Sequence, residues 1–281
     1  MNRPAQYHQH NEVQRYIADK VWSKYSKWLQ WRHDGQDTLL DVGTGTGNVL
    51  MEIVKPRIAK TYRKIVGTDV APEVIEFAQN YYRSPKKCEF RVLNICTEQP
   101  LPHDLLGQFD HVTSFNCLHW LKNQEQALRN IYDLIRPEGG DCLLSFAPYV
   151  PIMDIYESLR DSATWAPYLG HTDYFNGPLQ RIEEFALVKL LQDIGFYNVH
   201  VQFNYDVYNY DSPQEFSDQM AASSLFLKHV PASMHEKLMV DFLEVARRLG
   251  CRASSACGTK CKFSLNFTNA VVYAKKLPQR R

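Results

Sequence analysis

The feature that most constrains the fold is a glycine-rich turn directly after a short apolar run. Residues 38–42 read Thr-Leu-Leu-Asp-Val, residues 43–47 read Gly-Thr-Gly-Thr-Gly, and a helical segment interrupted at Pro56 follows. Glycines permit a tight turn and let a ligand approach the main chain more closely than a Cβ would allow. The order predicts strand, turn and helix, with a ligand-free tight connection as the simplest alternative.

Strands and helices then alternate along the chain. The predicted strands are 38–42, 65–69, 88–93, 111–115 and 140–146, and the predicted helices between them include 72–82 and 124–134. Such alternation is typical of a parallel sheet with helices on both faces. A further helix over 183–194 and two alternating strands over 199–208 and 262–274 follow.

The rest of the chain reads as additions to one domain spanning 1–281. Apolar residues spaced three and four apart predict an amphipathic helix over Glu12–Trp31, within an N-terminal helical lid at 1–36. Residues 37–147 form the expected cofactor-binding core. Residues 148–180 and 211–258, the latter with a helix over 236–249, interrupt the alternation and are predicted to cap a substrate site.

Composition excludes several classes of protein. The formal charge is only +1, and no window holds the roughly 18 apolar residues that a membrane span needs. We therefore expect a cytoplasmic protein that binds neither nucleic acid nor the bilayer core. The seven cysteines suit reduced thiols, and the cluster at Cys251, Cys257 and Cys261 matches no zinc-site spacing, so no metal is expected.

Two carboxylates indicate which ligand the turn holds. Asp41 lies two residues before the first glycine, where it would repel a pyrophosphate but could pair with an ammonium group. Asp69 ends the second strand, where a carboxylate can accept hydrogen bonds from ribose hydroxyls. S-adenosylmethionine carries both an ammonium group and ribose hydroxyls, and a nicotinamide or flavin nucleotide is the alternative ligand.

These residues resemble the class I S-adenosylmethionine-dependent methyltransferases over 37–147. The resemblance implies a Rossmann-like, mostly parallel seven-stranded sheet closed by an antiparallel pair. Asn94 and Ile95 would then frame the adenine, Asn94 through its amide oxygen. The cofactor residues expected are Asp41, Gly43, Thr44, Gly45, Gly47, Asp69, Val70, Asn94, Ile95, Ser114 and Phe115.

The segment after the fourth strand, 114–121, should face the transferable methyl group. Its Trp120 can donate a hydrogen bond to a carboxylate, or it can be an ordinary core aromatic. Residues 7–15, 109–115 and 136–144, together with Trp120, resemble the insect juvenile hormone acid O-methyltransferases. The resemblance implies that Gln14 and Trp120 hold the substrate carboxylate, and that the substrate is a lipophilic acid such as farnesoic acid or juvenile hormone acid.

Several alternatives stay open. His119 could act as a base or only as a structural group, because a carboxylate needs no base to be methylated. Asn116 stands where an aromatic residue would be expected, which keeps other fatty or terpenoid acids as substrates. A small polar acid is disfavoured because 148–180 holds one arginine, Arg160, and no lysine. A non-carboxylate acceptor, a silent terpenoid- or cofactor-binding paralogue and an NAD-linked oxidoreductase are further alternatives, and the sequence leaves the oligomeric state open.

Overall fold

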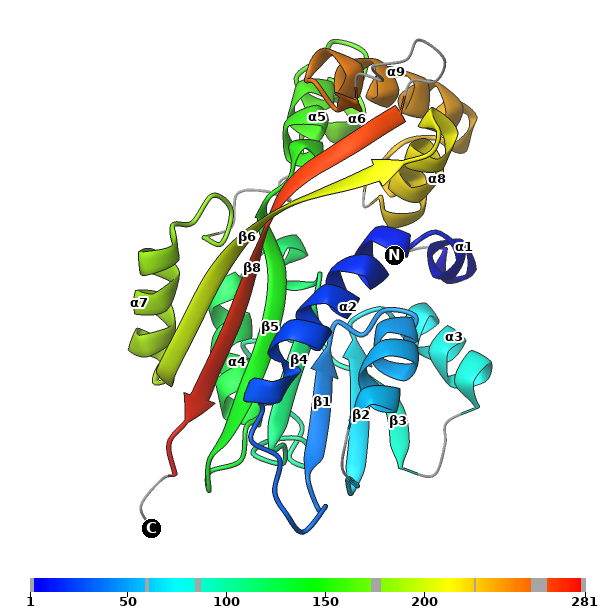
Figure 1. The fold of residues 1–281 in the computed structure, drawn as a ribbon. Coiled ribbons are helices and arrows are strands. Elements are labelled where there is room, and N and C mark those ends of the chain that lie inside the picture. Colours follow the sequence, from blue (N-terminus) through cyan, green and yellow to red (C-terminus); the bar gives the residue numbers. More distant parts are fainter. Residues whose placement is uncertain are drawn as a thin grey trace.

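The computed structural model describes residues 3–58, 61–83, 87–172, 178–224, 226–253 and 262–278, arranged around one twisted sheet (Figure 1). Its strands lie in the order β3-β2-β1-β4-β5-β8-β6. Their bounds are β1 Thr38–Val42, β2 Lys64–Asp69, β3 Cys88–Val92, β4 His111–Phe115, β5 Gly140–Tyr149, β6 Tyr197–Tyr210 and β8 Lys262–Lys276. A two-residue strand, β7 Arg252–Ala253, pairs with β8.

The sheet is parallel except at β8. Strands β1 to β5 pair in parallel, with Leu40 of β1 level with both Val66 and Val112, so their carboxyl ends share one edge. β8 runs antiparallel to both β5 and β6. The class I methyltransferase topology predicted from the sequence is confirmed.

Helices cover both faces of the sheet because successive strand residues point to opposite sides. Leu39 packs with the core under α2 (Glu12–Tyr25), the π-helix η2 (Val49–Val54) and α3 (Pro72–Tyr82). Leu40 packs with the core under α4 (Gln124–Leu134) and α7 (Glu184–Ile194). The remaining short elements of this half are α1 Pro4–Gln9 and the 3-10 turns η1 Ser26–Trp28, η3 Lys55–Arg57 and η4 Leu118–Trp120.

The helix expected over Glu12–Trp31 is shorter than predicted. It ends at Tyr25 and continues as the 3-10 turn η1. Both helix types place residues three apart on one side, so Tyr25 and Trp28 pack together, with ring centroids 5.0 Å apart, across the change. Several strands, in contrast, are longer than predicted. β5 reaches Tyr149, β6 extends beyond both ends of the predicted range 199–208, and β8 extends beyond the C-terminal end of the predicted range 262–274.

The segments that interrupt the alternation pack together above the carboxyl ends of the strands (Figure 1). Aromatic contacts join them: the rings of Tyr156 and Phe226 stack 3.8 Å apart, and those of Phe216 and Phe263 lie 5.0 Å apart. This helical layer therefore shares a core with the upper part of β8. Its elements are α5 Pro151–Arg160, α6 Ala166–Leu169, α8 Pro213–Ser223, η5 Leu227–His229, η6 Ala232–Met234 and α9 His235–Arg248.

A buried charge cluster lies at the amino ends of β4 and β5, opposite the end that the helical layer covers. His111 lies between two carboxylates, with Nδ1 2.5 Å from Asp141 Oδ1 and Nε2 3.2 Å from Asp37 Oδ1. Burial alone would lower the pKa of His111, but the hydrogen bonds with Asp141 and Asp37 raise it to about 9. Asp141 also accepts the Gln30 backbone N–H at 2.7 Å, which ties the segment after α2 to the sheet.

No helix among the described residues is both long and apolar enough to cross a bilayer. The described ranges also hold no group of three His, Cys, Asp or Glu side chains arranged for a metal ion. Cys257 and Cys261, which the sequence analysis weighed as metal ligands, lie outside the described residues.

Candidate active site

The glycine-rich turn has the backbone that its sequence predicts. Gly43, Gly45 and Gly47 have φ values of +71°, +56° and +84°, in the left-handed region that other residues rarely adopt. A Cβ on Gly43 would lie 2.2 Å from Cys117 Sγ. The turn is therefore packed against the segment after β4 and leaves no room for a side chain at its first position. Thr44, the next predicted residue, is buried, and its N–H donates to the Thr68 carbonyl at 2.8 Å.

Asp41 and Asp69 flank this turn at the carboxyl ends of β1 and β2. Asp41 is 2% exposed, and burial raises its pKa to about 6, although the Thr113 hydroxyl donates to Oδ1 at 2.8 Å. Asp69 accepts the Gly45 N–H on Oδ2 and the Ala71 N–H on Oδ1, both at 3.1 Å, and burial raises its pKa as well. A buried carboxylate with a raised pKa is stabilised by a cationic ligand.

Among the other predicted cofactor residues, two have exposed side chains and three have buried ones. Val70 is 58% exposed just beyond Asp69, and Asn94 is exposed after β3, where its Oδ1 accepts the Cys96 N–H at 3.0 Å. Ile95 is buried in the core on the α4 face. The side chains of Ser114 and Phe115 are also buried: the Ser114 hydroxyl donates to the Val42 carbonyl at 2.9 Å, and Phe115 packs edge-on against Trp22. At 114 and 115, therefore, the backbone is the part left for a ligand.

The N-terminal helix α1 lies over the glycine-rich turn. Tyr7 comes within 3.6 Å of where a Gly45 Cβ would be, and His8 Nδ1 lies 3.2 Å from Thr46 Oγ1. The His8 ring also contacts Tyr81 of α3 at a centroid distance of 4.4 Å. This helix therefore packs against the turn; it lies within residues 1–36, and the role of that segment as a lid stays a prediction.

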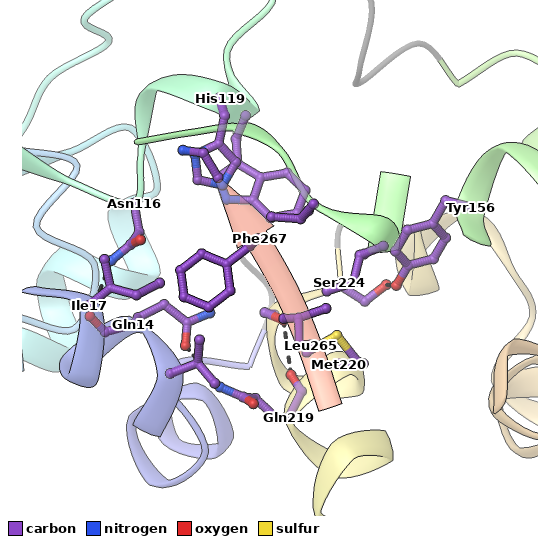
Figure 2. Close-up of a pocket in the computed structure, with 16 residues that line it drawn as sticks. Gln14, Ile17, Asn116, His119, Tyr156, Gln219, Met220, Ser224, Leu265 and Phe267 are labelled. Atoms are coloured by element: carbon purple, nitrogen blue, oxygen red, sulfur yellow. Dashed lines mark hydrogen bonds between the residues drawn. The ribbon is translucent and has the colours of Figure 1, made fainter. Parts of the chain in front are cut away.

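Beside the turn, a cavity opens between the sheet and the helical layer (Figure 2), and the space among its lining residues, part of it open to solvent, is about 650 Å³. We call it the acceptor cavity. The described residues that line it carry no Lys, Arg, Asp or Glu; they are Val13, Gln14, Ile17, Asn116, His119, Trp120, Ala147, Val150, Ile152, Tyr156, Gln219, Met220, Ser223, Ser224, Leu265 and Phe267.

The fold brings Gln14, His119 and Trp120 together in this cavity, although more than a hundred residues separate the first from the others. Gln14, on α2, is fixed twice: its backbone carbonyl accepts from Asn116 Nδ2 at 3.2 Å, and its Oε1 accepts from Gln219 Nε2 at 3.1 Å. Figure 2 shows Gln14 and Asn116 on one side of the cavity, with Tyr156 and Ser224 on the other.

His119 is held as a neutral ring. It is buried, its Nδ1 accepts the Ala147 N–H at 3.4 Å, and its backbone carbonyl accepts from Gln180 Nε2 at 2.6 Å. Burial lowers the pKa of His119 to about 3. Trp120 follows on the same 3-10 turn, with its ring 5.0 Å from that of His119. The polar side of the cavity therefore presents neutral groups.

Comparison with known proteins identifies the family. The methyltransferase domain family matches residues 40–140. The chain is 37% identical to juvenile hormone acid O-methyltransferase of Drosophila melanogaster over 99% of this chain and 94% of that protein. It is 34% identical to juvenile hormone acid O-methyltransferase of Bombyx mori over 99% and 98%. The chain belongs to the juvenile hormone acid O-methyltransferase family.

Membership of the juvenile hormone acid O-methyltransferase family makes this chain an S-adenosylmethionine-dependent methyltransferase, as the sequence predicted, and not a nicotinamide-linked enzyme. Solved structures agree on the fold. The YcgJ protein of Bacillus subtilis superposes with a TM-score of 0.59 at 16% identity, covering 92% of this chain and 98% of that one. Haemonchus contortus phosphoethanolamine N-methyltransferase 2 superposes with a TM-score of 0.53 at 14% identity, covering 92% and 52%.

The cofactor site of this family member fits S-adenosylmethionine. Gly43, Gly45 and Gly47 give the turn a left-handed backbone that lets a ligand approach the main chain, and the buried Asp41 carboxyl offers a partner for the ammonium group. Asp69, at the end of β2, has two oxygens for the ribose hydroxyls. These individual roles stay predictions.

Sequence reasoning named Gln14, His119 and Trp120 as site residues and missed, among other residues that line the acceptor cavity, Gln219, Leu265 and Phe267. Asn116 stood out in the sequence because an aromatic residue was expected there; its φ of +54° is one that asparagine tolerates better than bulky residues. The alternation of β8 places Leu265 and Phe267 on one face of that strand, and this pattern could have signalled a pair of inward-facing residues. No local pattern marks Gln219.

Proposed function

We propose that this protein transfers the methyl group of S-adenosylmethionine to the carboxylate of a lipophilic acid, with farnesoic acid or juvenile hormone acid as the substrate. The observation that carries the proposal is the acceptor cavity itself, which combines a neutral polar side at Gln14 and Trp120 with apolar walls. The names of the Drosophila and Bombyx relatives support the same substrate class.

Methylation of a carboxylate requires the side chains to position the two reactants and little else. A carboxylic acid with a solution pKa of roughly 4 to 5 is ionised at neutral pH, so its oxygen can act as a nucleophile without a general base. His119, with a pKa lowered to about 3, is too weak a base to add anything there. When bound, S-adenosylmethionine supplies an electrophilic methyl group on a cationic sulfur.

Gln14 and Trp120 would orient the anion. Both side chains can donate N–H groups, and neither carries charge, so they hold the carboxylate without the strong stabilisation by an arginine that would weaken its nucleophilicity. Correct alignment of two reactants can lower a barrier by up to roughly 7–11 kcal/mol. The apolar walls, including Ile17, Leu265 and Phe267, would bury the hydrocarbon tail.

One assay tests the proposal against its alternatives. Purified protein is incubated with methyl-labelled S-adenosylmethionine and, separately, farnesoic acid, juvenile hormone acid, a medium-chain fatty acid and a small tricarboxylate. We expect labelled ester from the terpenoid acids and none from the tricarboxylate. Cofactor binding with no ester from any acid would instead support a silent binding protein.

A variant tests the role of the indole. Trp120→Phe keeps an aromatic ring and removes the N–H donor, so the KM for the acid should rise roughly 10- to 100-fold, the usual effect of losing a hydrogen bond to a charged group. Binding of S-adenosylmethionine, followed by calorimetry, should not change. An unchanged KM would show that Trp120 does not hold the carboxylate.

A further inference from the structure

The side-chain amide of Gln14 can face the acceptor cavity in two ways. Its oxygen accepts hydrogen bonds and its nitrogen donates them, yet the two ends are nearly the same size, so shape does not select between them. Only the nitrogen end can bind a carboxylate. Whatever contacts the other end of the amide therefore decides whether Gln14 attracts or repels an acid.

Gln219 makes that contact. It lies on α8, is 1% exposed, and donates from Nε2 to Gln14 Oε1 at 3.1 Å. With the oxygen of Gln14 occupied in this way, the nitrogen is the end left for a ligand. The backbone of Gln14 is held independently by Asn116, so the amide orientation is the one freedom that Gln219 restricts.

The stability of the folded protein does not explain why a glutamine is buried at position 219. Its Oε1 is buried without a hydrogen-bond partner among the described residues, an arrangement that destabilises a folded protein compared with an apolar side chain of the same size. The backbone of α8 does not require a glutamine there, because the Gln219 carbonyl accepts from the Ser223 hydroxyl whatever the side chain. A buried polar side chain of this kind points to a functional constraint.

We propose that Gln219 is a positioning residue that turns the NH2 group of Gln14 toward the carboxylate of the acid substrate. The proposal rests on the carboxylate-binding role of Gln14 given under the proposed function. It assigns part of the site to α8, in the segment that the sequence analysis treated only as a cap.

Gln219→Glu tests the proposal because the new side chain changes its hydrogen-bonding role with pH. As a carboxylate, Glu at 219 can only accept, so it should bind the NH2 of Gln14 and leave the Gln14 oxygen facing the substrate. When protonated, its O–H can donate to Gln14 Oε1 again. Burial should raise the pKa of this Glu toward neutrality.

We therefore expect kcat/KM of Gln219→Glu for farnesoic acid to fall roughly 10- to 100-fold at pH 8, mainly through KM, and to recover as the pH is lowered to 6. The acid stays ionised over this range. Wild type should show no such recovery. Gln214→Glu, the same change at an exposed site on the same helix, is the matched control and should behave like wild type.

Two further variants separate this inference from the proposed function. Gln14→Leu should raise KM for the acid, and adding Gln219→Glu to it should cost nothing more, because the two side chains act as a unit. If Gln14→Leu leaves KM unchanged, the carboxylate-binding role of Gln14 is wrong. If Gln14→Leu raises KM but Gln219→Glu matches wild type at every pH, the inference about Gln219 is overturned.

Should Gln219→Glu fail to fold, Gln219→Met provides the test. It removes both polar ends in a similar volume and should raise KM for the acid at all pH values, with unchanged affinity for S-adenosylmethionine. A folded Gln219→Met with the KM of wild type would also overturn the proposal.

Discussion

The buried carboxyl of Asp41 should make the cofactor-free protein less stable than it could be. Burial raises its pKa from 3.8 to about 6, and each pKa unit corresponds to about 1.36 kcal/mol. The ionised form therefore costs the folded state about 3 kcal/mol at pH 7. Asp41→Asn removes the charge but keeps an oxygen that can accept from Thr113, so it should stabilise the cofactor-free protein by about that amount.

The sign of the shift fixes its pH dependence. Because the folded pKa lies above the unfolded one, the penalty is absent below about pH 4, grows between pH 4 and 6, and is complete above that range. The advantage of Asp41→Asn should therefore shrink to about half at pH 5. Urea unfolding of the cofactor-free proteins, followed by circular dichroism at pH 7 and pH 5, measures both values.

Ligand binding should reverse the order of stability. S-adenosylmethionine should raise the unfolding midpoint of wild type strongly and that of Asp41→Asn little, because the variant lacks the partner for the ammonium group. Asp193→Asn, at an exposed site on α7, is the control and should change stability little at either pH. The reasoning is refuted if Asp41→Asn is less stable than wild type at pH 7, or if its gain is the same at both pH values.

Two further predictions concern the base of the sheet and the turn. The carboxylates of Asp37 and Asp141 raise the folded pKa of His111 to about 9, so the stability that this charge cluster confers should be complete below about pH 6.5 and lost as the pH rises through 9. Urea unfolding of wild type should show this fall in the free energy of unfolding, and urea unfolding of His111→Gln should not. Gly43→Ala should lower the melting temperature and abolish S-adenosylmethionine binding in calorimetry, and adding Cys117→Gly should restore only part of the stability, since the positive φ at 43 persists.

The parts of the site that sequence could predict are those set by neighbouring residues. The turn at 43–47 and the carboxylates that flank it depend on a strand, a few glycines and a second strand end, all visible in short stretches. Gln14 and Trp120 were found through a family resemblance, and the fold places both in one cavity. The enzyme class followed from these features together.

The remaining parts depend on contacts between distant segments. Gln219 and Gln14 are 205 positions apart, and nothing near either residue indicates that they meet. Asn116 looked anomalous in sequence because its backbone conformation and its bond to Gln14 are both tertiary features. The end of α2 at Tyr25 was hidden because a 3-10 turn continues the same apolar spacing.

The place of β8 in the sheet has a consequence for synthesis of the chain. β8 lies between β5 and β6, yet it follows both in sequence, and it supplies Leu265 and Phe267 to the acceptor cavity. On the ribosome, β5 and β6 must each wait with an unpaired edge until β8 emerges, which exposes the nascent chain to aggregation. The strands around the glycine-rich turn can pair earlier. A nascent chain should thus form its cofactor site before its acceptor cavity. Its need for chaperones should be greatest between the synthesis of β5 and the synthesis of β8.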